Sequence, residues 1–261
     1  MSLMQEIRDH AVPANSVAIW WLGQTGYIFK SPGGTVVSVD AYLTDSCATL
    51  SDVMDLKRRA PILIAPEELD VEVFACTHNH QDHTDPDTIR GLRCKRTAMF
   101  VGPHPSCEVF AAEGIPSDRI RATWPDCALT FADLTLRGTW ALPTDTSDLN
   151  HMGFVLQFAD GPKIYHTGDT DDSPILASAA KHAPDVMMVV INGGFNNLSA
   201  WEAAVLTAAI KPKVAIPCHY DMFADNAIDP RQFAAALSQT APAVRYQEMQ
   251  YGQVFVYARP E

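Results

Sequence analysis

The amino-acid sequence predicts an α/β fold in which two β-sheets pack face to face and helices cover their outer surfaces. Three observations support this: apolar runs broken by turn residues in the first third, alternating strand and helix patterns in the final third, and enough apolar residues for a large core. The chain has 261 residues, of which 47% are hydrophobic and 19% charged. Pro and Gly are spread along it without a linker or repeat, so we expect one domain over residues 1–261.

The N-terminal third predicts a group of strands. Residues 17–43 read VAIWWLGQTGYIFKSPGGTVVSVDAYL, a series of apolar runs separated by Gly23, Gly26 and the SPGG of residues 31–34. Short apolar runs bounded by Gly and Pro are typical of strands joined by hairpin turns. Residues 71–78 (VEVFACTH) form another apolar run, which is too short for a buried helix and predicts a further strand.

Helices and strands alternate after that strand. Residues 85–92 predict a helix opening with Asp85 as N-cap and Pro86 at the first helical position. The further predicted strands cover residues 97–102, 134–142, 153–158, 163–168, 185–191, 213–220 and 253–258. The further predicted helices cover residues 104–114, 173–182, 199–210 and 229–239, and a turn is expected at 159–162. Two β-rich halves that each carry helices favour two packed sheets.

The charge balance argues against a nucleic-acid partner. Asp and Glu number 31 against 19 Lys and Arg, which gives a formal charge of −12. An acidic protein repels the phosphate backbone unless it carries a local basic patch. The basic runs LKRRA (56–60) and RCKR (93–96) are short, and we expect them to be solvated surface.

Membrane association and disulfides are also not expected. No apolar stretch reaches the roughly 18–20 residues needed to cross a bilayer, so we expect no membrane partner. The six cysteines include no C-x-x-C pair, and the N-terminus shows no signal pattern. Reduced thiols and a cytoplasmic location follow as expectations, with Cys76 and Cys218 as buried core thiols.

One short segment concentrates groups that bind metals. Residues 75–88 (ACTHNHQDHTDPDT) contain His78, His80, Asp82 and His83 in the pattern H-x-H-x-D-H, directly after a predicted strand. Residues two apart in an extended chain face the same side, so His78 and His80 can converge on one ion, while Asp82 and His83 can present to a second. Neutral imidazole and carboxylate are ligands for zinc, manganese or iron. We therefore expect one or two divalent ions, zinc or manganese, rather than a plain polar loop.

Further ligands must come from other parts of the chain. Asp169 in YHTGDTDDS follows a predicted strand and a glycine, and its carboxylate could bridge two ions. His219 in PCHYD lies at the end of another predicted strand. Strand ends of a rigid sheet are places where loop residues can be held for chemistry. Asp169 and His219 are thus expected to complete the site.

These motifs, taken in order, are similar to those of the metallo-β-lactamase superfamily, whose fold is a four-layer αββα sandwich. Within it, the segments 20–40, 77–85, 164–171 and 216–223 resemble the L-ascorbate-6-phosphate lactonase family. The resemblance implies a metal-dependent hydrolase that opens a lactone, or a related ester, of a small phosphorylated sugar acid by a metal-bound hydroxide. It implies that Asp82 orients or deprotonates the nucleophile and that the substrate is a small anion.

Four other residues are weaker candidates. His151 in DLNHMGF and Asp145 in PTDTSD are alternative sources of the ligand that the family has between His83 and Asp169, or else pocket residues. His166 precedes TGD and is a candidate orienting partner for a metal ligand. His104 lies at a predicted helix start, where backbone N–H groups favour an anion. It is either a residue of the helix cap or a contact for an anionic substrate.

Two other functions stay open beside lactone hydrolysis. The same fold could cleave a small-molecule phosphodiester, or the chain could bind metal without catalysis. A homo-oligomer also stays open, with the segments 222–224 (MFA) and 246–252 (YQEMQYG) as candidate exposed surfaces.

Overall fold

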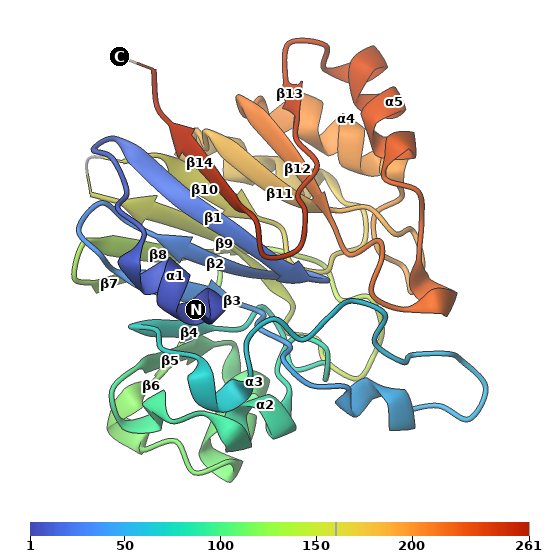
Figure 1. The fold of residues 1–261 in the computed structure, drawn as a ribbon. Helices are drawn as coiled ribbons and strands as arrows, with labels where there is room; N and C mark the ends of the chain where they lie inside the picture. Colours follow the sequence, from blue (N-terminus) through green and yellow to red (C-terminus); the bar gives the residue numbers. More distant parts are fainter. Residues whose placement is uncertain (160, 261) are drawn as a thin grey trace.

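Two seven-stranded mixed sheets form the centre of the chain in the computed structural model, which describes residues 1–159 and 161–260 (Figure 1). The first sheet has the order β14 (Val254–Ala258), β1 (Ser16–Gly23), β2 (Gly26–Lys30), β3 (Val36–Val39), β4 (Val73–Ala75), β5 (Met99–Gly102), β6 (Ile120–Ala122). The second has the order β13 (Arg245–Tyr246), β12 (Val214–Cys218), β11 (Val186–Val190), β10 (Lys163–His166), β9 (Met152–Phe158), β8 (Leu134–Trp140), β7 (Ala128–Phe131).

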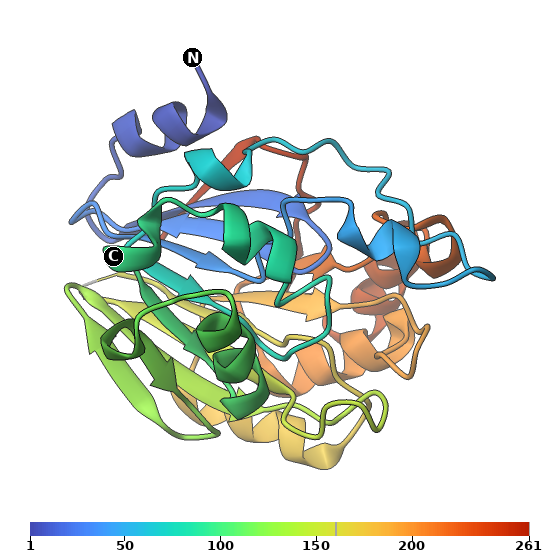
Figure 2. The same ribbon diagram turned by 90° about the horizontal axis from the view of Figure 1, so that it is seen from below.

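Helices cover the outer face of each sheet. The α-helices are α1 (Leu3–Asp9), α2 (Pro86–Gly91), α3 (His104–Ala112), α4 (Ala200–Ile210) and α5 (Arg231–Thr240). Short 3-10 helices are η1 (Ser46–Thr49), η2 (Pro66–Glu68), η3 (Cys94–Arg96), η4 (Ser117–Arg119), η5 (Pro174–His182) and η6 (Ala224–Asn226). In Figure 2 the blue α1 lies on one side of the two sheets, and the orange α4 and gold η5 lie on the other. The predicted αββα sandwich is confirmed.

The alternation of side chains along β1 explains the layering. Val17, Ile19 and Trp21 belong to the core cluster between the two sheets, while Ala18 and Trp20 pack in the cluster under α1 and α3. Successive residues of a strand point to opposite faces, so a strand buried on both sides is apolar throughout. This explains the continuous apolar run that predicted a strand here.

Parallel pairing brings several strand ends to one edge. β3, β4, β5 and β6 pair in parallel in the first sheet, as do β10, β11, β12 and β13 in the second. The carboxyl ends of parallel strands meet at one edge of a sheet, where ligands commonly bind. The loops that follow β3, β4, β10, β11 and β12 therefore meet at the same edge of the sandwich.

The predicted elements are mostly confirmed, with a few differences. Asp85 caps α2 and Pro86 is its first residue, as predicted. Residues 174–182 form a 3-10 helix rather than an α-helix, and α1, β6, β7 and β13 were not predicted. Among the described residues, no helix is both long and apolar enough to cross a membrane. The predicted turn at 159–162 includes Asp160, which lies outside the described residues.

Two surface predictions were wrong. Met222 and Phe223 are buried against Tyr42 and Cys47, so the MFA segment is not an exposed surface. Arg58, expected in a solvated run, donates to backbone carbonyls within the chain and lies over a tyrosine ring. The prediction that Cys76 and Cys218 are buried free thiols is confirmed.

Candidate metal centre

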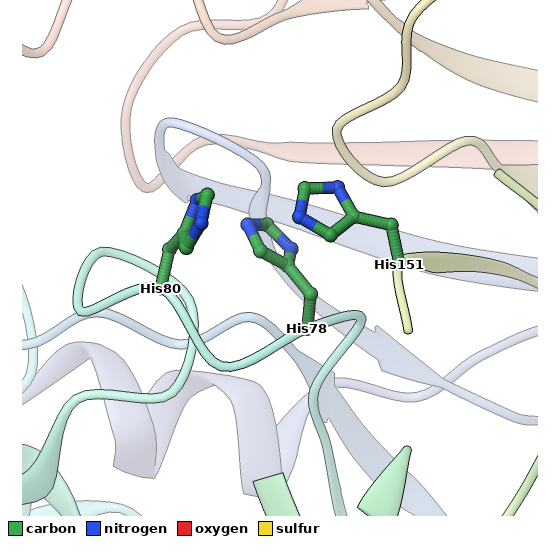
Figure 3. A group of neighbouring side chains, drawn as sticks. All are labelled: His78, His80 and His151. Carbon is green, nitrogen blue, oxygen red and sulfur yellow. The ribbon is translucent and has the colours of Figure 1, made fainter. Parts of the chain in front are cut away.

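Three histidines from two segments form the first cluster, shown in Figure 3. His78 and His80 lie in the loop after β4, and His151 immediately precedes β9. Their ring centroids lie 4.4 Å apart for His78 and His80, 3.9 Å for His78 and His151, and 5.1 Å for His80 and His151. One nitrogen from each ring lies within 4.8 Å of the other two, close enough to share one ion.

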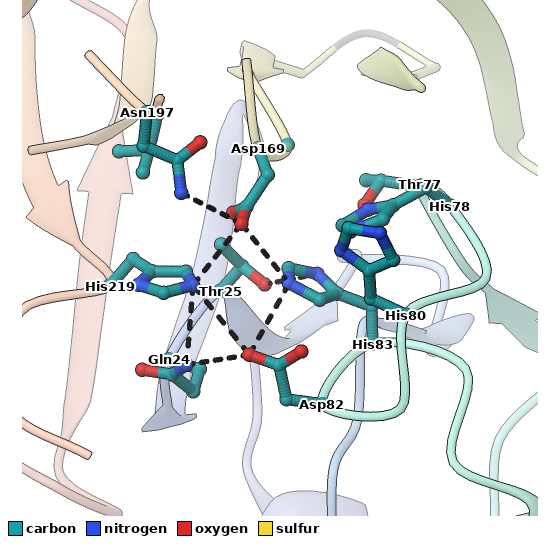
Figure 4. Close-up of polar contacts among 12 residues, drawn as sticks. Gln24, Thr25, Thr77, His78, His80, Asp82, His83, Asp169, Asn197 and His219 are labelled. Carbon is teal, nitrogen blue, oxygen red and sulfur yellow. Dashed lines mark hydrogen bonds and ion pairs between the residues drawn. The ribbon is translucent and has the colours of Figure 1, made fainter. Parts of the chain in front are cut away.

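Asp82, His83 and His219 form the second cluster (Figure 4). Asp82 Oδ2 lies 3.6 Å from Nε2 of His83 and 3.6 Å from Nε2 of His219. Asp82 and His83 come from the loop after β4, whereas His219 directly follows β12 of the second sheet. The cluster thus joins the two sheets.

Asp169 lies between the two clusters. Its Oδ2 is 3.5 Å from His83 Nε2 and 3.2 Å from His219 Nε2, and its carboxylate also groups with His78 and His83. The other carboxylate oxygen, Oδ1, is buried and has no hydrogen-bond partner. Asp169 follows β10 after Gly168, whose left-handed backbone (φ 63°) turns the chain toward the centre.

Each ring of the first cluster has one nitrogen in a hydrogen bond with a neighbouring group. His78 Nδ1 pairs with Thr77 Oγ1 at 3.1 Å, His151 Nδ1 with the carbonyl of Asp169 at 3.2 Å, and His80 Nε2 with Ser147 Oγ at 2.9 Å. Nε2 of His78 and Nε2 of His151 are buried without a partner. Metal-binding histidines are oriented in this way by such contacts.

Asp40, at the end of β3, orients the second cluster. Its Oδ2 lies 3.0 Å from Nδ1 of His83, and its two oxygens accept the backbone N–H and hydroxyl of Thr77 at 2.7 and 2.8 Å. Thr25 Oγ1 also lies 2.9 Å from His83 Nδ1. His83 Nε2 is left buried and unpartnered, facing Asp82 and Asp169. One carboxylate thus holds both the ligand His83 and the strand end that leads to His78.

Three residues at this edge have left-handed backbones. Gln24, Asp40 and His219 have φ values of 50°, 48° and 59°. Non-glycine residues adopt this conformation only where the surroundings fix it, and such positions cluster at functional sites. The backbone N–H of His219 donates to the carbonyl of Gln24 at 3.1 Å, so two of the three support each other.

Burial and the nearby charges shift the pKa values of the cluster. Burial lowers the pKa of His78 well below its usual value, and the rings of His83 and His151 lower it further. Burial also acts to lower the pKa of His219, but the Asp169 and Asp82 carboxylates outweigh it and raise that pKa to about 9. His78 is therefore a neutral donor, while the second cluster holds a proton that a cation would replace.

The donor set fits a divalent transition metal. Imidazole nitrogens and carboxylate oxygens are the ligands that zinc, manganese and iron share. Buried polar atoms are nearly always paired in folded proteins, yet Nε2 of His78, His83 and His151 and Oδ1 of Asp169 are buried without partners. Several of the unpartnered buried atoms thus gather in the two clusters, which is the arrangement expected of a metal-binding site.

The weaker candidates lie at different distances from the clusters. Asp145 is 55% exposed at the rim, 3.5 Å from His80 Nε2. His166 belongs to neither cluster; it donates from Nε2 to the carbonyl of Thr25 at 2.8 Å and accepts the N–H of Gly168 at Nδ1. His104 is 76% exposed at the start of α3, pairs with Glu108, and is not brought into the clusters.

Gln24 and Asn197 contact the cluster carboxylates and were not among the predicted site residues. Gln24 Nε2 donates to Asp82 Oδ2 at 2.7 Å, and Asn197 Nδ2 donates to Asp169 Oδ2 at 2.8 Å (Figure 4). Gln24 lies between two glycines at the end of β1, and Asn197 lies in the NGGFNN segment after β11. A polar residue directly after a buried strand is the signal that could have found Gln24, and the Gly- and Asn-rich segment 192–197 is the signal for Asn197.

The clusters open into a cavity of about 380 Å³. His80, Asp82, Asp169 and His219 contribute to its lining. A cavity of this size is at the lower end of small-molecule sites. The clusters can therefore meet a small molecule at their open side.

Comparisons with known proteins match most of the chain. Residues 18–219 match the family model described as a beta-lactamase superfamily domain. A curated relative from Salmonella heidelberg, named "Probable L-ascorbate-6-phosphate lactonase UlaG", is 22% identical over 289 aligned positions, which cover 94% of this chain and 80% of that relative.

Solved structures show the same fold. Igni18, described as a novel metallo hydrolase from Ignicoccus hospitalis, aligns with a TM-score of 0.74 at 20% identity over 94% of this chain and 100% of that one. A protein of Veillonella parvula, described as a possible metal-dependent hydrolase, aligns with a TM-score of 0.73 at 17% identity over 93% of this chain and 99% of that one.

Proposed function

Since the chain belongs to the beta-lactamase superfamily and has the metallo-β-lactamase fold, we propose that this metal-dependent hydrolase opens a lactone or a related carboxylic ester. The observation that supports the proposal best is the pair of clusters joined by Asp169 beside one small cavity. The resemblance to L-ascorbate-6-phosphate lactonases favours the lactone class. The cavity gives no support to a phosphate on the substrate, because the acidic and basic side chains that line it, apart from histidine, are carboxylates.

The two clusters would hold up to two divalent ions. His78, His80 and His151 would hold one, and Asp82, His83 and His219 the other, with Asp169 beside both. An ion bound by such ligands lowers the pKa of a coordinated water from 15.7 to about 7 and polarises a carbonyl oxygen. Zinc and manganese use the same ligands, so both are candidates.

Asp82 is the residue we propose to act on the attacking water. Its side chain is 17% exposed, in contrast to the buried His83, and it lines the cavity. Gln24 Nε2 holds one carboxylate oxygen at 2.7 Å, which fixes the orientation of the group. The carboxylate would orient the water and accept its proton as the carbonyl carbon is attacked. The ring C–O bond would then break, the alkoxide would take the proton from Asp82, and one hydroxy acid would leave.

Acid release from lactones tests the proposal. Protein stripped with a chelator and reloaded with Mn²⁺ or Zn²⁺ should open lactones, whereas the stripped protein should not. Asp82→Asn and His80→Ala should each lower kcat by at least about 10³-fold, in line with the loss of a central catalytic group, while the thermal unfolding profile keeps one cooperative transition. Full turnover in either variant would contradict the proposed site.

The same assay separates the other two functions. Bis(p-nitrophenyl) phosphate and small cyclic phosphodiesters are included beside the lactones. Turnover of phosphodiesters alone would replace the lactonase with a small-molecule phosphodiesterase. Tight metal binding without turnover of any ester or phosphodiester would favour a protein that binds metal without catalysis.

A further inference from the structure

We infer that the site selects a neutral lactone or ester that carries an apolar substituent, rather than a phosphorylated or otherwise anionic one. This inference rests on the proposed function, because it concerns the part of the substrate beyond the bond that is hydrolysed. Its basis is the set of large apolar side chains that line the cavity, Leu50, Leu56, Phe195 and Phe223, which we call the apolar wall.

The apolar wall combines buried and exposed side chains. Phe223 is buried and Leu56 packs against the same small cluster, so this part of the wall is fixed. Leu50 and Phe195 are 54% and 48% exposed, although both line the cavity. They come from segments far apart in the sequence, one after β3 and one after β11. Exposed apolar side chains that line a cavity together mark a binding surface more often than isolated ones do.

The backbone presents Phe195 at this position under strain. Phe195 and the next residue, Asn196, have left-handed φ values of 54° and 59°. A bulky residue in this region is an outlier that persists only when its surroundings fix it. Asn196 Nδ2 donates to the carbonyl of Thr144 at 2.8 Å, and Asn197 Nδ2 donates to Asp169. The hydrogen bonds of Asn196 and Asn197 therefore fix the loop that places Phe195 beside the cavity.

The charges around the cavity disfavour an anionic substituent. Asp145, at 55% exposure, lies on the rim beside His80, and the described lining residues include no Lys or Arg. Lys57 and Arg58 follow the wall residue Leu56, but neither lines the cavity, and the guanidinium of Arg58 donates to the carbonyls of Tyr42, Leu22 and Ala60. A phosphate carries a charge of about −1.5 to −2 at neutral pH and is bound best by basic side chains such as Arg. A phosphate on the apolar wall would meet apolar carbon and a carboxylate instead.

A series of γ-lactones tests the preference with the full-length, metal-loaded protein. The probes are γ-butyrolactone, its butyl- and phenyl-substituted forms, and L-ascorbate 6-phosphate. Each methylene that is buried against the wall should raise kcat/KM about 4-fold, so burial of two of them is enough for the butyl lactone to exceed the unsubstituted one by at least about 10-fold. L-Ascorbate 6-phosphate should be the poorest substrate. A higher kcat/KM for L-ascorbate 6-phosphate than for the butyl lactone would overturn the inference.

Variants of the wall locate the preference. Phe195→Ala and Leu50→Ala should each lower kcat/KM for the butyl lactone about 5- to 10-fold more than kcat/KM for the unsubstituted lactone. The matched control is Val205→Ala on α4, which removes a side chain that is 49% exposed and lies outside the cavity, and should change neither value. Equal losses for both lactones in the wall variants would overturn the inference.

Binding measured without turnover separates this inference from the proposed function. The corresponding γ-lactams, which resist hydrolysis, are titrated into the metal-loaded protein by calorimetry. Tighter binding of the butyl lactam, weakened in Phe195→Ala, supports the apolar wall even if no lactone is turned over, in which case the proposed function alone fails. Lactone hydrolysis without any preference in rate or binding leaves the proposed function standing and overturns the apolar wall.

Discussion

Asn197 donates its side-chain amide to Oδ2 of Asp169 at 2.8 Å while its amide oxygen accepts the backbone N–H of Thr170 at 2.9 Å. The two contacts fix the carboxylate of Asp169 and the backbone beside it with one side chain. The same Oδ2 lies 3.2 Å from His219 and 3.5 Å from His83. The loop after β11 therefore sets the position of the acid that lies between the two clusters.

Removing this amide should loosen the metal centre. Asn197→Ala leaves Asp169 without its orienting donor, and the loss of such a partner costs roughly 10- to 100-fold in metal affinity or activity. Asn197→Asp keeps an acceptor for Thr170 but places a second carboxylate beside Asp169, so it should lower activity at least as much. Competition with a chromophoric chelator measures the affinity. Native metal affinity in both variants would mean that Asn197 does not position Asp169.

Each cluster should account for one ion. His151→Ala removes a ligand from the first cluster and His219→Ala removes one from the second, so each variant should retain about one ion per chain fewer than the native protein. His104→Ala is the control, because this ring is exposed and not part of either cluster. Atomic emission spectroscopy measures the number of ions that each variant retains. Unchanged content in His151→Ala would remove His151 from the site.

Loss of Asp40 should affect stability and metal binding together. Asp40→Ala removes the buried acceptor of the Thr77 N–H and hydroxyl, at about 1–3 kcal/mol for each unsatisfied donor, and leaves Nδ1 of His83 with Thr25 as its partner. Asp40→Asn retains an acceptor for Thr77 but turns an amide toward His83. We expect a lower melting temperature in Asp40→Ala than in Asp40→Asn, and weaker metal binding in both. Native-like metal binding by Asp40→Asn would count against the orienting role.

The metal-free protein should lose stability as the pH rises. Burial acts to lower the pKa of His219, but Asp169 and Asp82 raise it from 6.5 to about 9. A folded-state pKa above the unfolded value gives stability that is complete below pH 6.5 and is lost as the pH rises through about 9. The melting temperature of chelator-stripped protein should therefore fall across this range.

Two controls accompany that measurement. Metal-loaded protein should show a flatter profile, because a cation takes the place of the proton at His219. Stripped His219→Asn should decline less steeply, with His83 as the remaining contributor, since the Asp82, Asp169 and Asp40 carboxylates outweigh burial and raise the pKa of His83 as well. A constant melting temperature for the stripped native protein would contradict the assigned charge state.

Contiguous patterns made the core of the site predictable. H-x-H-x-D-H places His78, His80, Asp82 and His83 within six positions, so their proximity follows from the local chain. Asp169 and His219 were found because each ends a predicted strand, and parallel strands that end at one edge bring such residues together. The sequence favoured His151 over Asp145 as the ligand between His83 and Asp169 but did not decide between a ligand and a strand-edge residue. Only the pairing of β9 with its neighbours distinguishes a residue that joins a cluster from one at the rim.

Contacts that depend on tertiary packing could not be predicted. Asn197 reaches Asp169 because the loop after β11 folds back over the end of β10, which no local pattern indicates. Met222 and Phe223 were expected at the surface, yet both pack in a buried cluster with Tyr42. Arg58 was read as solvated from its charge, although long side chains can bury their stems and donate to carbonyls.

The most direct test titrates stripped protein with Mn²⁺ or Zn²⁺ while bound metal and lactone hydrolysis are followed on the same samples. The account predicts no hydrolysis without metal, a rate that rises with occupancy up to two ions per chain, and metal-loaded Asp82→Asn that stays inactive. Hydrolysis by fully stripped protein, or an Asp82→Asn variant as active as the native protein at equal metal content, would contradict it.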